Sequence, residues 1–250
     1  MRKQFPTLAD AFMNYFDVDL VNGDDMTAKA AGVRYRVYCE EFDFERSDDF
    51  PDHLETDSFD SYSIQSLITH RRTGQSAGCV RLVCASHEQQ LPLELHCLNS
   101  VYLETAELLM SERAKVCEFS RLAVDSRFRK RAGEDHTRLG EFDALDCSHQ
   151  ELRTFSMVGM AAFLSAFALA QIANRTKIFA MMEPKLPALL RRAGIVVQQS
   201  GDFVDYHGKR AVYYVALDGA LLNMREDVRV LYDEIHRRLD ASYRRIAAVA

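Results

Sequence analysis

The chain has 250 residues, enough for one large domain with a substantial hydrophobic core. Hydrophobic residues make up 48% of the chain and charged residues 27%, as in ordinary soluble globular proteins. The formal net charge of -6 disfavours a general nucleic-acid-binding protein, which would usually be basic.

The spacing of cysteine and histidine disfavours metal and disulfide chemistry. No two cysteines have CxxC spacing, and no histidine lies at metal-ligand spacing from a cysteine or another histidine. No secretory signal opens the chain. We therefore expect reduced thiols, no zinc site, no permanently bound cofactor and a cytoplasmic protein. The cysteines concerned are Cys39, Cys79, Cys84, Cys97, Cys117 and Cys147.

The N-terminal part of the chain predicts two helices and a loop. Apolar residues at helical spacing predict one helix over residues 1–20 and a second over residues 26–41. Arg34 and Tyr38 lie four residues apart in the second helix and therefore share one face. The acidic, aromatic stretch over residues 42–59 predicts a loop, either a mobile one or a plain solvated connector.

Strands dominate the next part of the chain. Residues 61–70 and 77–85 predict two strands joined as a hairpin by a glycine-containing turn. A short helix is expected over residues 105–113, followed by an apolar strand over residues 115–124. Residues 134–153 show only a weak helical spacing.

Residues 154–174 carry no charge and are long enough for about one bilayer crossing. Their richness in Ala, Ser and Gly, together with Gln171, favours a buried helix inside the domain over a transmembrane span. Such a helix either forms plain core or walls an acyl chain.

The C-terminal part continues the alternation of strands and helices. It predicts a strand over residues 176–182, a helix over 183–194, strands over 195–198 and 210–217, and a charged helical tail over 221–246. The simplest interpretation is one α/β domain with a helical tail.

The strand over residues 115–124 contains a carboxylate and a guanidinium, Glu118 and Arg121. Side chains three residues apart point to opposite faces of a regular strand, and a β-bulge between them would re-aim one. A carboxylate inside a buried strand is costly unless it is paired or used. Glu118 is therefore either a base that takes a proton from an amine, or half of a structural ion pair with Arg81 or Arg121.

A basic segment that ends in glycine follows this strand. If a helix begins near Gly133, its free amides and the preceding arginines would suit a phosphate group. A solvated basic turn is the alternative. The residues concerned are Arg127, Arg129, Lys130, Arg131 and Gly133.

Two further observations bear on chemistry. Asp57 and Asp60 lie three residues apart in the acidic loop, where they either bind an amine, order Arg34 and Arg81, or are simply solvated. The sequence contains no GxSxG motif, and no cysteine has an evident histidine partner. The lack of a nucleophile favours direct transfer between two bound substrates over a covalent intermediate.

Several of these motifs occur in an order that is characteristic when taken together. The stretch Glu118-Phe119-Ser120-Arg121, the pair Asp57 and Asp60, and Arg81 resemble motifs of the GNAT-type acyltransferases. The resemblance is to the branch of acyl-homoserine-lactone synthases and N-acyl amino acid synthases. That branch has an N-terminal motif of an arginine and two aromatic residues, which is similar to Arg34, Tyr38 and Phe44 here. Residues 180–195 and 206–210 look most similar to acyltransferases associated with PEP-CTERM/exosortase systems.

The resemblance implies an α/β fold with a mixed central sheet, splayed at the Glu118 strand and flanked by helices. It implies an acyltransferase domain over residues 1–217, capped by its N-terminal helices, and a helical extension over residues 218–250. It implies Glu118 and Arg121 as catalytic residues. The implied acceptor-binding residues are Arg34, Tyr38, Phe44, Asp57, Asp60 and Arg81, and the implied phosphopantetheine-binding residues are Leu122, Val124, Arg129, Lys130, Arg131 and Gly133.

The activity implied is transfer of a fatty acyl group from an acyl carrier protein or CoA thioester to an amino acid or similar amine. The family's loop, Arg-x-x-Gly-x-Gly/Ala, is here Arg129-Lys130-Arg131-Ala132-Gly133, and the displaced glycine favours a carrier-protein donor over acetyl-CoA. Tyr38 and Phe44 replace other aromatic residues of the lactone synthases, which disfavours a homoserine lactone product. An autoinducer synthase that uses S-adenosylmethionine and a catalytically silent acyl- or partner-binding module are the alternatives.

Overall fold

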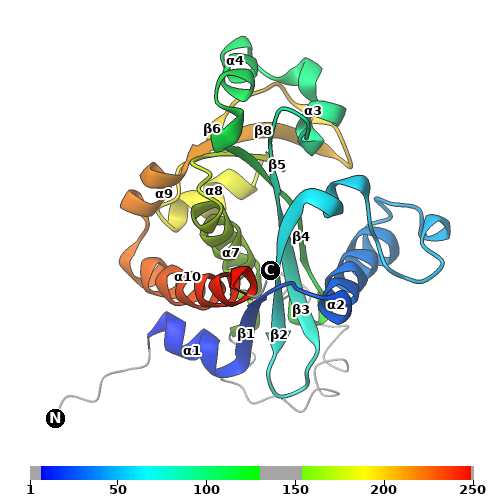
Figure 1. Ribbon diagram of the computed structural model, residues 1–250, viewed down its shortest axis with the longest axis vertical. Helices are drawn as coiled ribbons and strands as arrows, with labels where there is room; N and C mark the ends of the chain where they lie inside the picture. The colour runs from blue at the N-terminus through cyan, green and yellow to red at the C-terminus, as the bar shows by residue number, and fades with distance from the viewer. Residues whose placement is uncertain (1–6, 130–153, 249–250) are drawn as a thin grey trace.

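The computed structural model describes residues 7–129 and 154–248, which form helices on both faces of a mixed eight-stranded sheet (Figure 1). The strand order is β1-β2-β3-β4-β5-β8-β6, and β7 pairs with β8 beside this path. All neighbouring strands are antiparallel except β4 and β5, which are parallel. The predicted α/β architecture with a mixed central sheet is confirmed.

The strands are short at the C-terminal edge and longer in the centre of the sheet. They are β1 (Phe16–Leu20), β2 (Ser63–His70), β3 (Ser76–Cys84), β4 (Val116–Val124), β5 (Lys177–Met182), β6 (Gln198–Gln199), β7 (Val204–Asp205) and β8 (Lys209–Ala216). The α-helices are α1 (Leu8–Tyr15), α2 (Asp24–Tyr35), α3 (Pro92–His96), α4 (Leu103–Ser111), α7 (Val158–Ile172), α8 (Leu186–Arg192), α9 (Leu217–Asn223) and α10 (Glu226–Ala247).

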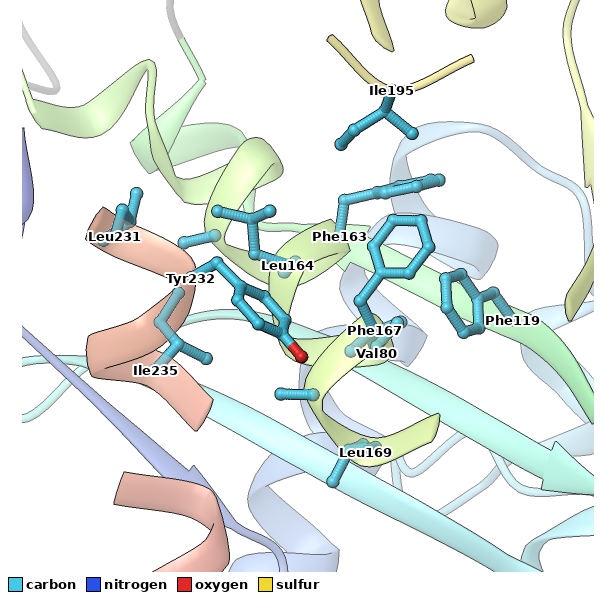
Figure 2. Close-up of a cluster of buried hydrophobic side chains, with 14 of the residues drawn as sticks. Val80, Phe119, Phe163, Leu164, Phe167, Leu169, Ile195, Leu231, Tyr232 and Ile235 are labelled. Carbon is cyan, nitrogen blue, oxygen red and sulfur yellow. The ribbon is translucent and has the colours of Figure 1, made fainter. Parts of the chain in front are cut away.

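The uncharged helix α7 lies in the main core, between the sheet and α10 (Figure 2). Its Phe163 and Phe167 meet Phe119 of β4 edge to face, with ring centroids 5.7 and 5.1 Å apart. Its single amide, Gln171, accepts a hydrogen bond from the Tyr232 hydroxyl of α10. Within the described ranges, no helix is both long enough and apolar enough to cross a membrane.

The opposite face of the sheet is covered by two separate groups of elements (Figure 1). Helix α2 packs over β2, β3 and β4 through a small cluster that includes Val33 and Val37. The segment with α3 and α4 packs over β4, β5 and β8 through a second cluster, which includes Leu93 and Phe179.

The single helix expected over residues 1–20 is wrong. Helix α1 ends at Tyr15, and the next five residues form the edge strand β1, paired antiparallel with β2. Phe16, Val18 and Leu20 are buried while Asp17 and Asp19 are less so, which is the period-two pattern of a strand. The strand expected over residues 195–198 is also displaced, because β6 is confined to Gln198–Gln199.

Two other expectations change in detail. The second predicted helix is α2, extended by a π-helical turn, η1 (Arg36–Glu41), of a kind frequent at functional sites. The helical tail is two helices, α9 and α10, and the buried side of α10 belongs to the main core. The described cysteines are all free thiols, and Cys147 lies outside the described residues.

Candidate functional site

A β-bulge in β4 determines the geometry of the candidate site. Arg81 of β3 lies opposite Ser120 and Cys79 lies opposite Ala123, so one β3 residue faces two residues of β4, Arg121 and Leu122. Arg121 has φ +49°, the left-handed conformation typical of one kind of bulge residue. In a regular strand Glu118 and Arg121 would point to opposite faces, and a bulge between them re-aims one side chain.

The bulge brings these two side chains to the face covered by α2 and α3. Glu118 is paired with Val83 and Ser120 with Arg81 in the same ladder, so all four side chains point to one face. Arg121 reaches the same side, where its guanidinium lies 5.3 Å from the centre of the Tyr38 ring. A regular strand would have turned Arg121 toward α7 instead.

The sheet splays immediately beside this bulge. β4 pairs with β5 only from Val116 to Phe119, whose last partner is Ala180. β5 continues to Met182 in pairing with β8, while β4 continues to Val124 in pairing with β3. Beyond Phe119, the edge of β4 that faced β5 therefore has no strand neighbour among the described residues. The predicted splay at the Glu118 strand is confirmed.

The segment over residues 34–60, called the cap here, is held over the bulge by ion pairs. It contains η1 and the 3-10 turn η2 (Ser47–Asp49), and it ends within a second 3-10 turn, η3 (Ser58–Tyr62). Three buried or nearly buried arginines meet four carboxylates in and around it, which is far denser than surface pairing. The arginines are Arg34, Arg81 and Arg121, and the carboxylates are Glu45, Glu55, Asp57 and Asp60.

Asp57 and Asp60 are oriented by the local structure of η3. The Asp57 carboxylate accepts from the Phe59 N–H, and the Asp60 carboxylate accepts from the Asp57 N–H, forming a capping box. The box aims both carboxylates at the guanidiniums of Arg34 and Arg81, and Arg81 contacts both of them. Asp57 binds Arg81 through two hydrogen bonds of 2.5 and 2.9 Å, and Asp60 binds Arg34 through two of 2.6 and 3.1 Å.

The two pairs are electrostatically coupled. Burial alone would raise the pKa of Asp60, but the hydrogen bonds and charge of Arg34, with the charge of Arg81, lower it to about 2. Arg81 likewise outweighs burial and lowers the pKa of Asp57. The geometry shows that these two aspartates order Arg34 and Arg81, and binding of an amine by them stays a prediction.

Arg121 completes the network from the bulge itself. Its Nε donates to Glu55 at 3.1 Å and its Nη2 to Glu45 at 3.0 Å, and Nη2 lies 3.2 Å from Asp57. Glu55, Tyr38 and Asp57 together outweigh the effect of burial and raise the pKa of Arg121. The bulge is thus tied to the cap by charge.

Tyr38 adds a neutral contact between cap and bulge. Its hydroxyl donates to the backbone carbonyl of Leu122 at 3.0 Å, and burial raises its pKa to about 12. Arg34 and Tyr38, predicted to share a helix face, both meet the network, although the π-helical turn intervenes. Leu122 is therefore fixed at its carbonyl, and Val124 is buried in the main core.

Glu118 lies in different surroundings from the other carboxylates. Its side chain is fully buried beside the apolar cluster that contains Leu93 and Phe179, and Oε2 accepts the Leu93 N–H at 2.8 Å. Burial raises its pKa to about 8, against the opposing effects of that N–H and of Arg81. It is not paired closely with either arginine that the structural alternative named, so the arrangement favours a proton-transfer group.

On the other side of the splay, the turn between β7 and β8 faces the cap. The His207 ring packs against Phe44 in a tilted arrangement with centroids 5.1 Å apart, and the guanidinium of Arg210 lies 5.3 Å from the Phe44 centroid. His207 adopts φ +53° at the turn, and burial lowers its pKa. Tyr206 is close enough to Glu118 and Arg121 for both charges to act on its pKa, which burial raises.

The predicted phosphate-binding segment lies only partly within the described residues. Arg129 forms an ion pair with Glu41 of η1 and stacks over Phe42 at 5.1 Å. Arg127 binds Asp125, which also accepts from Arg36 at 2.7 Å. Lys130, Arg131 and Gly133, and with them most of the predicted phosphate-binding segment, lie outside the described residues.

The fold therefore gathers most of the predicted residues around one splay. Glu118, Arg121, the cap residues and Arg81 converge on it, as the sequence motifs required. Sequence reasoning did not assign roles to Tyr206, His207 or Arg210, which the β5–β8 pairing brings to the same place. The available signal was an aromatic and basic cluster around the glycine turn at Gly208.

Similarity to known proteins agrees with this geometry. Residues 33–138 match the family model described as an acetyltransferase (GNAT) domain. The acyl-homoserine lactone synthase LasI is similar at a TM-score of 0.52 and 15% identity, covering 84% of this chain and 94% of LasI. The CoA-dependent acyl-homoserine lactone synthase BjaI, with SAM and isopentyl-CoA, gives 0.55 and 17%, covering 92% and 98%.

A third similar structure has a different named activity. FeeM, an N-acyl amino acid synthase from uncultured soil microbes, gives a TM-score of 0.50 and 11% identity, covering 84% of this chain and 94% of FeeM. A search of curated proteins found no match. At such identities the similarity establishes the fold, which is that of the GNAT-type acyltransferases.

Proposed function

We propose that the protein is an N-acyltransferase that moves a fatty acyl group from a phosphopantetheine thioester to the amine of an amino acid or similar acceptor. The observation that carries this proposal is the splay of the sheet directly beside the β4 bulge, under an ordered cap. The known activities of BjaI and FeeM, acyl-homoserine lactone and N-acyl amino acid synthesis, support transfer to nitrogen. The donor is carried by acyl carrier protein or CoA.

On the donor side, the phosphopantetheine arm would follow the edge of β4 past Leu122 and Val124. The phosphate would meet the basic segment that begins at Arg129, where it would compete with Glu41 for the guanidinium. The acyl chain would pass through the splay toward Phe119, Phe163 and Phe167. These rings lie together on the α7 side of the sheet (Figure 2).

On the acceptor side, the amine would approach the thioester from the face that carries Glu118. Backbone N–H groups of β4 over residues 118–122 would polarise the thioester carbonyl. The amine nitrogen bonds to the carbonyl carbon, and the carbon–sulfur bond breaks. Glu118 takes the proton that the amine loses, and the departing thiolate regains one. Arg121 and the other network residues hold the cap and the bulge in place around these atoms.

The test combines purified protein with acyl carrier protein or CoA thioesters of several chain lengths and a pool of amino acids. Thiol release is followed first, and product mass second. The proposal expects N-acyl amino acids, and a fall of about 10²- to 10⁴-fold in rate for Glu118→Gln. Glu112→Gln, at a half-exposed surface carboxylate, is the matched control and should leave the rate unchanged.

Two other results would replace the proposal. An acyl-homoserine lactone formed from S-adenosylmethionine would make the protein an autoinducer synthase. Binding of acyl thioesters without thiol release from any donor would make it a silent acyl-binding module. The likeness of its motifs to acyltransferases of PEP-CTERM/exosortase systems leads us to include acyl carrier protein among the donors tested first.

A further inference from the structure

Arg210 differs from the three arginines of the cap network, Arg34, Arg81 and Arg121, in how its guanidinium is held. It stands at the start of β8, next to Ala211, which pairs with the last residue of β5, Met182. This position places it on the far side of the splay from Arg121. Its guanidinium packs over Phe44 of the cap, 5.3 Å from the ring centroid.

The carboxylates of the cap network are bound by the network's own three arginines. Arg34, Arg81 and Arg121 each hold at least two of them at 3.2 Å or less. These three guanidiniums are therefore saturated and serve to order the cap.

Among the residues that the structure describes, one carboxylate lies within 4 Å of the Arg210 guanidinium, and that contact is loose. Glu183 Oε1 lies 3.7 Å from Nη2, beyond hydrogen-bond distance, and the Glu183 side chain is 64% exposed. The Nε of Arg210 is buried and has no hydrogen-bond partner in the part of the chain that the structure describes. A buried N–H without an acceptor is costly, so an incoming acceptor group would be favoured there.

We propose that Arg210 binds the carboxylate of the acceptor, so that the site selects amines that carry a carboxylate, such as α-amino acids. This inference rests on the proposed acyl transfer and names the acceptor class. An arginine offers a planar fork of donors that matches a carboxylate, and Phe44 fixes the plane of that fork. With the carboxylate at Arg210, the amine of the acceptor is directed across the splay toward β4 and Glu118.

Binding of product-like ligands tests the inference without requiring turnover. The probes are N-lauroyl derivatives of leucine, phenylalanine and tyrosine, each paired with the N-lauroyl derivative of the corresponding decarboxylated amine. Calorimetric titration measures the affinity ratio within each pair. Wild type should favour the carboxylate member of at least one pair by about 10- to 100-fold, and Arg210→Gln should bring that ratio close to one.

Two further variants test whether misfolding, or the loss of any nearby positive charge, explains the effect of Arg210→Gln. Arg210→Lys keeps the charge without the fork and should retain a reduced preference, so the test survives if Arg210→Gln does not fold. Lys209→Gln removes the neighbouring cation, which lies over Phe203, and should keep the wild-type ratio. Equal binding of both members of every pair by wild type, or an unchanged ratio in both Arg210 variants, overturns the inference.

The outcome is separable from that of the proposed function. A carboxylate preference that depends on Arg210, in a protein that transfers no acyl group, would uphold the inference and refute the enzyme. Acyl transfer to amino acids and to their decarboxylated counterparts at equal rates, unaffected by Arg210→Gln, would do the reverse.

Discussion

The two faces of the sheet around the splay are stabilised in different ways. On the α7 side, Phe119, Phe163 and Phe167 form an aromatic cluster within the main core. On the cap side, ion pairs join a segment of turns to β3 and β4, and the cap's own apolar contacts are few. Burial of aromatic rings is insensitive to pH and salt, whereas each ion pair requires both partners to be charged.

This difference separates two tasks. The apolar side supplies a fixed wall, because its rings pack closely against one another within the main core. The ionic side supplies orientation, because paired guanidiniums and carboxylates fit in only one arrangement. Where buried ion pairs orient a segment, every charge must keep its partner. The largest losses of stability are therefore expected where one partner is removed.

The largest effect is expected for Arg81→Met. This change leaves Asp57 and Asp60 without the guanidinium that both contact, in a partly buried place. Removing one partner of a buried pair costs about 3–5 kcal/mol, far more than the pair adds when intact. Urea unfolding followed by circular dichroism measures the loss.

Arg71→Met is the matched control for that change. Arg71 pairs with Asp17 at 2.6 Å, but both side chains are about 40% exposed. Such a pair contributes at most about 1 kcal/mol. Equal losses for Arg71 and Arg81 would mean that the cap network is no more than surface pairing.

A second effect concerns Glu118 and pH. Its pKa rises to about 8 on folding, from an ordinary value of 4.5, so the folded state binds its proton more tightly than the unfolded state. That contribution to stability is complete below pH 4.5 and is lost as pH rises toward 8. Glu118→Gln cannot ionise, and its amide oxygen can still accept the Leu93 N–H.

The comparison of wild type with Glu118→Gln isolates the contribution of Glu118 protonation to the free energy of unfolding. Between pH 5 and pH 7, wild type should lose roughly 2–3 kcal/mol of unfolding free energy relative to the variant. Unfolding is measured in urea at each pH for both proteins. Parallel stability curves would show that Glu118 keeps an ordinary pKa, and its role as a base would then lose its physical support.

A smaller effect is expected on the apolar side. Phe163→Leu replaces one ring of the cluster with a smaller apolar side chain. It should lower the free energy of unfolding by about 1–2 kcal/mol. If the acyl chain occupies the space beside these rings, the variant should favour longer acyl thioesters than wild type does. Rates over a series of chain lengths measure this shift, and an unchanged optimum would place the chain elsewhere.

Local motifs were predictable because neighbouring residues fix them. The strand with Glu118 and Arg121, the hairpin before it and the Asp57–Asp60 pair all depend on contacts within short stretches of sequence. The helix predicted through Phe16 failed because Phe12 and Phe16 are spaced for a helix, while Phe16, Val18 and Leu20 also alternate as in a strand. Pairing with β2 decided between the two patterns.

The rest of the site depends on contacts between distant parts of the chain. The left-handed conformation of Arg121 has no signature such as glycine, since the cap's carboxylates hold it in place. Arg210 and His207 reach the cap only because β8 pairs with β5 across the sheet. Sequence spacing carries no information about such an approach.

The smallest effect is expected for Tyr38→Phe, which removes the one neutral hydrogen bond between cap and bulge described above. The loss of the bond to the Leu122 carbonyl should cost at most about 1 kcal/mol. A hydrogen bond within the protein replaces hydrogen bonds to water in the unfolded chain, so its net contribution to stability is small. Tyr62→Phe is the matched control, since Tyr62 also donates to a backbone carbonyl, that of Gln90, at 3.0 Å. The two variants should therefore be destabilised by similar amounts.

Their effects on acyl transfer should nevertheless differ. Leu122 belongs to the bulge that would present backbone N–H groups to the thioester, so a loosened bulge should lower kcat while KM for the amine changes little. Tyr62→Phe should leave both constants at their wild-type values, because its bond lies outside the network. Equal kinetic effects in the two variants would mean that the cap stabilises the fold without orienting the bulge. The ionic side would then contribute only stability, as the apolar side does.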